Sequence, residues 1–382
     1  MFARRFVTLA AALCLAAVPT RDQRPQTDDQ RPTTNDIRAA RNVFVITMDG
    51  LRWQEVFGGL QADLLTKDGG GVRDITSSES RFGGATAAAR REKLLPFLWT
   101  VVARNGQIFG DAARNSPSRV TNTMRFSYPG YNELLSGFAD PRIDSNDKVR
   151  NPNVTVLEWL NRKPAYHGKV AAFASWELLS WILNEPRSGV LSNGDGPPIA
   201  RPETERQRAI NDLAADLPPV WGSTRFDAAT GAGALEYLKA RRPRVLYVML
   251  GETDEWAHGR RYDLYLDAAW RNDRFVRQLW ETAQSMPEYA NQTALVLSTD
   301  HGRGERAEDW TSHGREVPAA DRIWIAAMGP RIPPLGVRDG VTSTQAQVAA
   351  SVAAVLGEDF TAAEPKAARP LNFQSSPEKS HD

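Results

Sequence analysis

Three aspartates and three histidines of this sequence have side chains and spacings suited to binding metal ions. They fall in four short segments, in chain order Asp49-Gly50, Asp254-x-x-x-His258, Asp300-His301-Gly302 and His313-Gly314. Carboxylate oxygens and imidazole nitrogens are donors that zinc accepts in proteins. Six donors would serve two ions with open positions, whereas a closed structural zinc site takes four. Two ions about 4 Å apart can hold the attacking and leaving oxygens of an in-line displacement.

Each segment by itself also allows a plainer interpretation. An aspartate at the end of a strand, such as Asp49, is often a turn former or a helix cap. Asp254 and His258 would share one face of a helix, which suits a metal but equally suits a surface contact. His313 alone could be an ordinary loop histidine. Only the combination of the segments favours a metal centre.

The pair Asp300-His301 is more unusual than the other segments. Adjacent side chains of a regular strand point to opposite faces, so these two can converge only from a turn. Gly302 permits such a turn. The two remaining histidines of the chain, His167 and His381, are given no role.

A candidate nucleophile lies in the segment 125–137, which is typical of a turn that enters a short helix. Pro129 suits a first helical turn, and Gly137 suits the helix end. Ser127 would then lie at the helix N-terminus, where free amide groups favour an anion. A hydroxyl placed there beside a metal could attack phosphorus. The alternative is that Ser127 is a plain N-cap residue.

Alternating strands and helices are expected to position these residues. Near-continuous apolar runs, typical of buried parallel strands, occupy residues 42–48, 169–174, 244–250, 293–299 and 322–328. Helical spacing is found over residues 94–104, 262–284 and 345–356. We therefore predict an α/β fold with a central, mostly parallel sheet and helices on both faces. In such sheets ligands bind beyond the carboxyl ends of the strands, where the three aspartates are predicted to lie.

Residues 1–20 have the pattern of a secretory signal peptide. Arg4 and Arg5 precede an uncharged run over residues 6–18, which breaks at Pro19. A transmembrane helix needs about 20 apolar residues, so the run is short for one. A buried N-terminal helix is the alternative. We expect a periplasmic or secreted protein with no transmembrane segment once the signal is removed.

The rest of the chain is expected to divide into three parts. Residues 21–41 are polar and would form a disordered linker, residues 42–360 the catalytic domain, and residues 361–382 a flexible tail. Cys14, the only cysteine, lies within the signal segment, so no disulfide is expected. A net charge of +1 predicts no nucleic-acid-binding patch. We expect a small-molecule partner, and no oligomeric state is predicted.

In their order along the chain, these motifs resemble those of the alkaline phosphatase superfamily, and they span residues 49–314. The resemblance implies a three-layer sandwich and two divalent metal ions, which we expect to be Zn²⁺. It implies one ion on Asp254, His258 and His313, and the other on Asp49, Asp300, His301 and Ser127. It further implies that Ser127 attacks the substrate and forms a covalent phosphoserine intermediate.

Departures from the superfamily's motifs bear on the substrate. Met48 precedes Asp49 where calcium-dependent sulfatases resemble each other in having paired aspartates, and Tyr131 stands where their motif has arginine. Those sulfatases need an oxidised residue, so that class is not expected. The phosphodiesterase branch is similar in its hydroxyl residue, aromatic and proline, and it implies that Asn146 binds substrate.

We therefore predict a metal-dependent phosphoric ester hydrolase acting on a phosphomonoester, phosphodiester or phosphonate. The alternatives are a sulfate-ester hydrolase with an unmodified serine, and a non-catalytic binding protein with the same fold. Aromatic side chains that could line an apolar substrate cleft, but which we assign mainly to packing, are Trp53, Trp176, Trp181 and Trp256.

Overall fold

The structure is a computed structural model that describes residues 39–374. Its main sheet has eight strands in the order β10-β2-β9-β7-β1-β6-β4-β5. Along the chain these strands are β1 (Asn42–Met48), β2 (Gly106–Phe109), β4 (Val170–Ala174), β5 (Leu191–Asn193), β6 (Val245–Leu250), β7 (Thr293–Ser298), β9 (Ile325–Met328) and β10 (Gly336–Val337). Within this described sheet β9 alone runs opposite to the others. The predicted mostly parallel α/β fold is confirmed.

The central strand β1 pairs with β6 on one side and with β7 on the other, so that Val45 lies between Tyr247 and Val296. Every residue of β1 is buried, and the apolar run from Val43 to Ile46 is typical of a strand that is covered on both faces. Phe44 and Ile46 pack into one core and Val43 and Val45 into the other, because successive side chains point to opposite faces.

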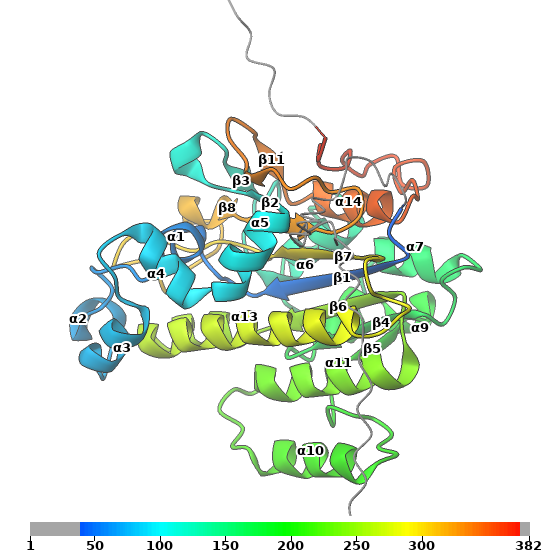
Figure 1. Ribbon diagram of the computed structural model, residues 1–382, viewed down its shortest axis with the longest axis horizontal. Coiled ribbons are helices and arrows are strands. Elements are labelled where there is room, and N and C mark those ends of the chain that lie inside the picture. The colour runs from blue at the N-terminus through cyan, green and yellow to red at the C-terminus, as the bar shows by residue number, and fades with distance from the viewer. Residues whose placement is uncertain (1–38, 375–382) are drawn as a thin grey trace, which may run out of the picture. The chain divides into compact units, whose positions relative to one another are not determined.

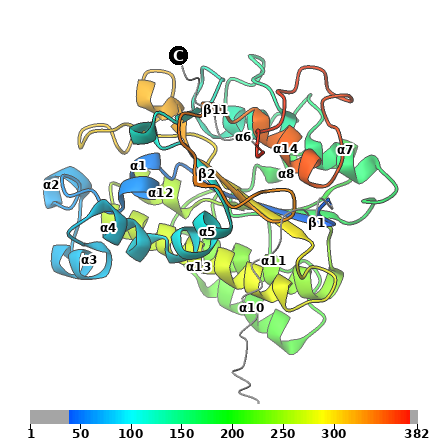
Figure 2. The same cartoon turned by 45° about the horizontal axis from the view of Figure 1, so that its top comes forward.

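Helices cover both faces of the sheet (Figures 1 and 2). The face that carries Phe44 packs against α1 (Trp53–Gly58), α4 (Ala87–Leu94), α11 (Asp227–Arg241) and α13 (Tyr262–Gln284). The opposite face packs against α6 (Ser127–Ser136), α7 (Val156–Arg162), α8 (Leu179–Ile182) and α14 (Gln347–Val355). The three layers that the sequence predicted are therefore present.

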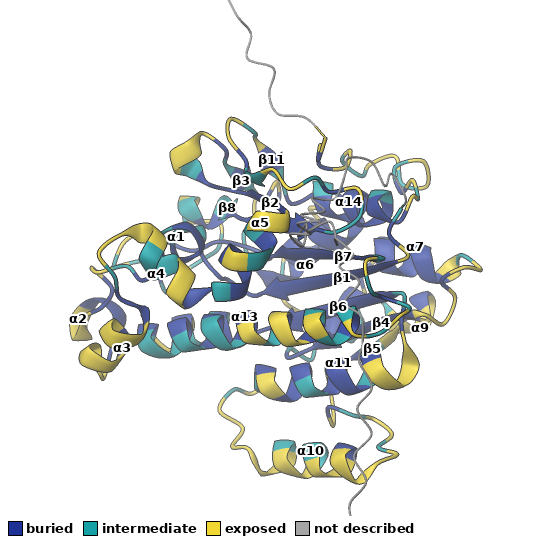
Figure 3. Ribbon diagram, in the orientation of Figure 1, coloured by how far each residue is buried: buried dark blue, intermediate teal, exposed yellow. Residues whose placement is uncertain are grey.

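The remaining elements are short or peripheral. They are α2 (Lys67–Gly70), α3 (Ile75–Phe82), a π-helical turn (Leu98–Val102), α5 (Ala103–Asn105), 3₁₀ turns (Ala112–Arg114 and Pro318–Asp321), α9 (Glu185–Ser188), α10 (Glu205–Asp216) and α12 (Glu252–His258). A small second sheet joins β11 (Ser343–Thr344), β3 (Ser118–Arg119) and β8 (Arg322–Ile323). Helix α10 begins with a capping box at Thr204, and most of its residues are exposed (Figure 3).

Two predicted elements differ from the structure. The helix expected over residues 94–104 is divided, because the Asp273 carboxylate accepts hydrogen bonds from the amides of Phe97 and Leu98 at the start of the π-helical turn. The strand expected over residues 322–328 breaks at Trp324, whose buried indole donates a 3.0 Å hydrogen bond to the Leu51 carbonyl. Its first part joins the second sheet as β8, and its second part becomes β9.

The flexible tail expected from residue 361 also differs from the structure over residues 361–374. Phe373 is buried and packs 6.2 Å from the ring of Phe109, and its carbonyl accepts a 2.8 Å hydrogen bond from Gln107. Apolar contacts thus hold this segment against the sheet. The expected signal peptide, most of the linker and residues 375–382 lie outside the described residues. Between residues 39 and 374, no helix combines the length and the apolar character that crossing a membrane requires.

Candidate active site

The six predicted metal ligands come together at the carboxyl ends of three neighbouring strands. Asp49 directly follows β1, and Asp254 lies on α12, which begins just after β6. Asp300 and His301 follow β7. Because the strand order is β7-β1-β6, these three chain segments meet at one edge of the sheet. His313 joins them from the loop between β7 and β8.

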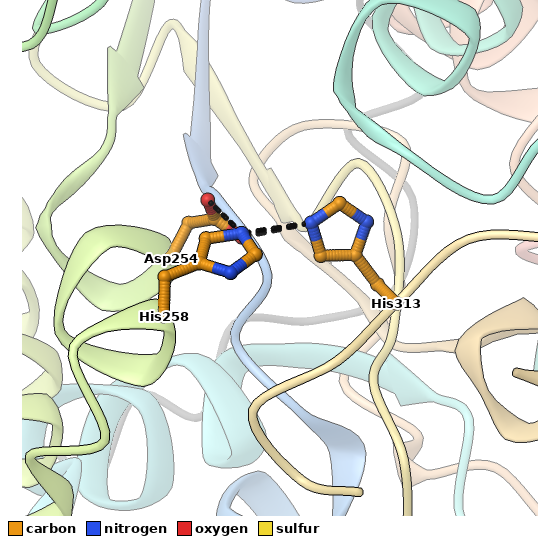
Figure 4. Close-up of side chains that lie close together, drawn as sticks. All are labelled: Asp254, His258 and His313. Carbon is orange, nitrogen blue, oxygen red and sulfur yellow. Dashed lines mark hydrogen bonds and ion pairs between the residues drawn. The ribbon is translucent and has the colours of Figure 1, made fainter.

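One group of potential ligands consists of Asp254, His258 and His313 (Figure 4). Nε2 of His258 lies 3.2 Å from Asp254 Oδ2 and 2.9 Å from Nε2 of His313. Nε2 of His313 is 3.8 Å from Asp254 Oδ1. One donor atom from each residue lies within 4.8 Å of the others, so these residues could hold an ion.

The second group consists of Asp49, Asp300 and His301. Nε2 of His301 lies 3.4 Å from Asp49 Oδ1 and 3.3 Å from Asp300 Oδ2. Its Nδ1 is 2.9 Å from the Gly302 carbonyl. Donation of the Nδ1 proton to that carbonyl leaves Nε2 as the free acceptor that a metal requires.

A bend at Asp300, just after β7, allows the side chains of Asp300 and His301 to converge. The Gly302 amide donates a hydrogen bond to the Ala320 carbonyl, and a Cβ at Gly302 would lie 2.2 Å from the Arg322 carbonyl oxygen. Only glycine fits this approach. The close approach at Gly302 agrees with the prediction that a glycine here permits the two side chains to meet.

Each carboxylate of the second group keeps one oxygen free. Asp49 Oδ2 accepts from Tyr131 and Asp300 Oδ1 accepts from the Gly50 amide, whereas Asp49 Oδ1 and Asp300 Oδ2 are buried with no hydrogen-bond partner among the described residues. Burial, together with the neighbouring carboxylates, raises the pKa of Asp49 and Asp300 well above the ordinary value. Buried anions of this kind need a compensating positive charge, and a divalent cation supplies it.

The group of Asp254, His258 and His313 has a different electrostatic environment. Burial works to raise the pKa of Asp254, but the guanidinium of Arg303 and the hydrogen bond from His258 hold it well below the ordinary value. Burial and the neighbouring His301 lower the pKa of His313 to about 2. An ionised carboxylate and a neutral imidazole are the protonation states that bind a metal.

Ser127 is the first residue of α6, and its Oγ lies 3.4 Å from Nε2 of His301. It lines a hollow of about 440 Å³ together with Asp49, Asp254 and His258, which we call the catalytic hollow. The N-cap of α6 is Phe126, so the interpretation of Ser127 as a plain N-cap is wrong. Its hydroxyl instead lies beside His301, and the residue lines the same hollow as Asp254 and His258.

Helix α6 packs closely on the segment after β7, and this packing fixes the position of Ser127. A Cβ at Gly130 would lie 2.4 Å from the carbonyl oxygen of Asp300. A side chain at this position would push the helix, and Ser127 with it, away from His301.

No known family model and no curated protein sequence matches the chain. Solved structures do. Wild-type alkaline phosphatase PafA is similar with a TM-score of 0.56 and 11% identity, over 88% of this chain and 99% of that one. The lipoteichoic acid synthase LtaP from Listeria monocytogenes gives 0.54 and 12%, over 84% and 72%. A Vibrio parahaemolyticus protein in the alkaline phosphatase superfamily gives 0.51 and 12%, over 88% and 71%.

The chain has the fold of the alkaline phosphatase superfamily. At these identities the likeness shows the fold alone. Asp49, Asp254 and His258 line the catalytic hollow together with the Ser127 hydroxyl. Asp300, His301 and His313 complete the two groups of potential ligands to which those three residues belong.

The helix N-terminus that the sequence predicted as an anion site offers fewer amides than expected. The Tyr128 amide donates a 2.9 Å hydrogen bond to Asn146 Oδ1, and Pro129 has no amide proton. Asn146 itself lines the catalytic hollow near Ser127. Its role in binding substrate remains a prediction.

Three further residues, to which the sequence analysis gave no supporting role, contact the potential metal ligands or their backbone. Tyr131 donates a 2.8 Å hydrogen bond to Asp49, Arg303 pairs with Asp254, and Gln345 donates to the carbonyls of Thr299 and Asp300. Tyr131 lies four residues after Ser127 on one helix, a spacing that could have indicated its position. Arg303 directly follows Gly302, whereas nothing in the sequence around Gln345 indicated it.

The four tryptophans considered for an apolar cleft divide between site and core. Trp176 lines the catalytic hollow. Trp53 packs against the core on the α13 face and Trp181 against the core on the α14 face, as the packing assignment predicted. Trp256 is half-buried on α12, and its ring centroid lies 4.9 Å from that of Trp221.

Proposed function

We propose that the protein is a metal-dependent hydrolase of phosphate-type esters that uses Ser127 as its nucleophile. The observation that carries the proposal is that the Ser127 hydroxyl shares one hollow with Asp49, Asp254 and His258 and lies 3.4 Å from His301. These residues belong to two groups of oxygen and imidazole donors, which Asp300 and His313 complete. The superfamily fold supports it, because its carboxyl-end edge is where ligands bind in open α/β sheets.

We infer that one divalent cation binds Asp49, Asp300 and His301, close to Ser127, and that a second binds Asp254, His258 and His313. Mixed carboxylate and imidazole donors favour zinc. When bound, such ions polarise the ester and lower the pKa of coordinated hydroxyl groups.

The residues of the chain then have separable roles. Ser127 Oγ forms a bond to phosphorus as the ester's alcohol leaves, and the serine proton is transferred to that alcohol overall. Water next attacks the same phosphorus and restores the serine hydroxyl. Tyr131 holds the Asp49 carboxylate in place, and Asn146 lies where its amide can donate to a substrate oxygen.

Beyond the proposed cations and their ligands, the side chains that line the catalytic hollow favour esters with a single negative charge. Among the residues that line it, Lys148 is the only lysine or arginine, and its Nζ lies 2.9 Å from Glu177. Asp147, Glu177 and Glu255 add negative charge. We therefore infer a preference for phosphodiesters and phosphonate monoesters over doubly charged phosphomonoesters. The same charge argument makes a sulfate ester the second candidate substrate.

A panel of chromogenic monoester, diester, phosphonate and sulfate substrates, each assayed with zinc, manganese or calcium, tests the proposal. We expect turnover of at least one phosphate-type ester, and Ser127→Ala should reduce it by several orders of magnitude without changing the melting temperature. Turnover of sulfate esters alone would favour the second candidate. Near-normal rates in the Ser127→Ala variant would rule out the serine mechanism.

We also propose, from residues 1–20 of the sequence, that the protein acts outside the cytoplasm. N-terminal sequencing of the mature protein, purified from its native cell, tests this. A mature chain that still begins at Met1 would contradict it.

A further inference from the structure

A second hollow adjoins the catalytic hollow and has a different lining. It has a volume of about 520 Å³ and lies between α10 and the segment 194–198. Its apolar wall residues include Pro197, Leu217 and Pro218, with Trp221 and Phe226 as aromatic side chains. Polar residues, among them Asp195 and Asn211, complete the lining. We call it the apolar hollow. It belongs to neither group of potential metal ligands.

The two hollows share a rim. Glu177, Ser223 and Thr224 line both of them. The Glu177 amide donates a 3.0 Å hydrogen bond to the Ser223 carbonyl, and Trp176 pairs with Thr224 in an antiparallel bridge. This short ribbon separates the hollows, so a molecule that occupied both would pass over Glu177 and Ser223.

The apolar hollow also contacts the helix that carries potential metal ligands. Trp221 packs at 5.0 Å from Phe226 and at 4.9 Å from Trp256, measured between ring centroids. Trp256 lies on α12 midway between Asp254 and His258. A ligand group that binds against Trp221 would therefore lie next to Trp256, which is on the same helix as Asp254 and His258.

One wall residue of the apolar hollow is a large apolar side chain that stays exposed. Leu217 is 37% exposed, although large apolar side chains are normally buried. Leu213 and Val220, at 67% and 48%, are exposed on the same chain segment but outside the lining. The polar Arg225 in the wall is already engaged, because its guanidinium donates to Asn193 and Gly196. An apolar surface that is left open beside a reactive hollow is typical of a ligand-binding site.

We propose that the apolar hollow binds an apolar organic group of the ester substrate, while the charged ester group occupies the catalytic hollow. This inference rests on the proposed function and adds the substrate class to it: esters of alcohols or phosphonic acids that carry a long alkyl or aromatic group. Because the two hollows share a rim, one substrate molecule can place its ester group in the catalytic hollow and its apolar group in the apolar hollow.

The test measures binding separately from turnover. The zinc-loaded Ser127→Ala protein is titrated by calorimetry with alkylphosphonates of one, four, eight and twelve carbons. Chains long enough to cross the rim should bind more tightly, by up to about threefold to fourfold for each methylene group that becomes buried. Equal affinity of the one-carbon and twelve-carbon compounds would overturn the inference.

A variant that fills the apolar hollow provides the second measurement. Ala215 lines it and is exposed on α10, so Ala215→Trp should fold normally and remove the advantage of the long chains. Ala228→Trp, on the exposed surface of α11 and outside this lining, is the matched control and should keep the advantage. Survival of the advantage in Ala215→Trp would contradict the site.

Turnover of the matching methyl and dodecyl esters by the wild-type protein separates the two proposals. If neither ester is hydrolysed but long phosphonates bind tightly, the hydrolase proposal fails and the apolar site stands. If the methyl ester is hydrolysed and chain length changes neither binding nor rate, the apolar site fails and the hydrolase proposal stands.

Discussion

Tyr131 donates a 2.8 Å hydrogen bond to Oδ2 of Asp49, and Oδ1 of the same carboxylate is buried without a hydrogen-bond partner among the described residues. The hydroxyl thus fixes the carboxylate in an orientation that directs its free oxygen toward His301, 3.4 Å away. A hydrogen bond from a neighbouring side chain to a metal-binding carboxylate orients that carboxylate toward the ion.

Tyr131→Phe removes that hydrogen bond while preserving the ring. We expect zinc affinity, measured by competition with a chromophoric chelator, to fall by about tenfold to a hundredfold, and ester turnover to fall with it. Tyr289→Phe is the control, because this buried hydroxyl donates to the Pro243 carbonyl instead of a candidate ligand. Unchanged affinity in Tyr131→Phe would mean that the hydroxyl does not support the site.

Metal content should reveal two separate sites. We expect close to two zinc ions per chain in protein prepared without chelators, measured by plasma mass spectrometry. His313→Ala removes one imidazole from one group and should lower the content toward one ion, because the other group keeps all its donors. His167→Ala, at a histidine outside both groups, should retain two ions. Metal-free wild-type protein after such a preparation would refute the metal centre.

Gly130→Ala tests whether close packing positions Ser127. The added methyl group would meet the Asp300 carbonyl oxygen at 2.4 Å, so the helix must shift. We expect a loss of about 1–3 kcal/mol in the free energy of unfolding, together with a lower turnover number. Gly222→Ala, where an added Cβ would meet no atom within 4 Å apart from its chain neighbours, should leave the free energy of unfolding near wild type. Full activity in Gly130→Ala would show that the approach of α6 is not required.

Asp273 should make stability depend on pH. Burial raises its pKa from 3.8 to about 7 in the folded protein, even though the amides of Phe97 and Leu98 donate to it. The unfolded chain therefore loses this proton first as pH rises, and the folded state loses stability between about pH 4 and 7. The expected slope for this one group is up to about 1.4 kcal/mol per pH unit.

Urea unfolding at several pH values measures that slope. Asp273→Asn should remove this group's part of it, so the difference between the wild-type and variant curves isolates Asp273. Asp216→Asn, on the exposed end of α10, is the control and should follow the wild-type curve. Parallel curves for wild type and Asp273→Asn would contradict the assignment.

Local sequence was sufficient for the elements that one stretch of chain specifies. The apolar run of β1 predicts a strand buried on both faces, and the spacing of apolar residues over 262–284 predicts α13 with the bounds that the structure gives it. The six potential ligands were also recognisable, because their donor types and the glycine after His301 are local features. Periodicity and residue chemistry act over a few residues, so the sequence carries them directly.

Only the tertiary structure decided what depends on contacts between distant segments. The order β7-β1-β6 brings Asp300, Asp49 and Asp254 to one edge, and no local pattern encodes the order of strands. Burial of Trp324 divides a predicted strand, and packing of Phe373 holds a segment that composition assigned to a tail. The apolar hollow likewise exists only because a chain excursion lies beside the helix that carries Asp254 and His258. Such long-range packing depends on the shapes of both partners, which neither segment specifies alone.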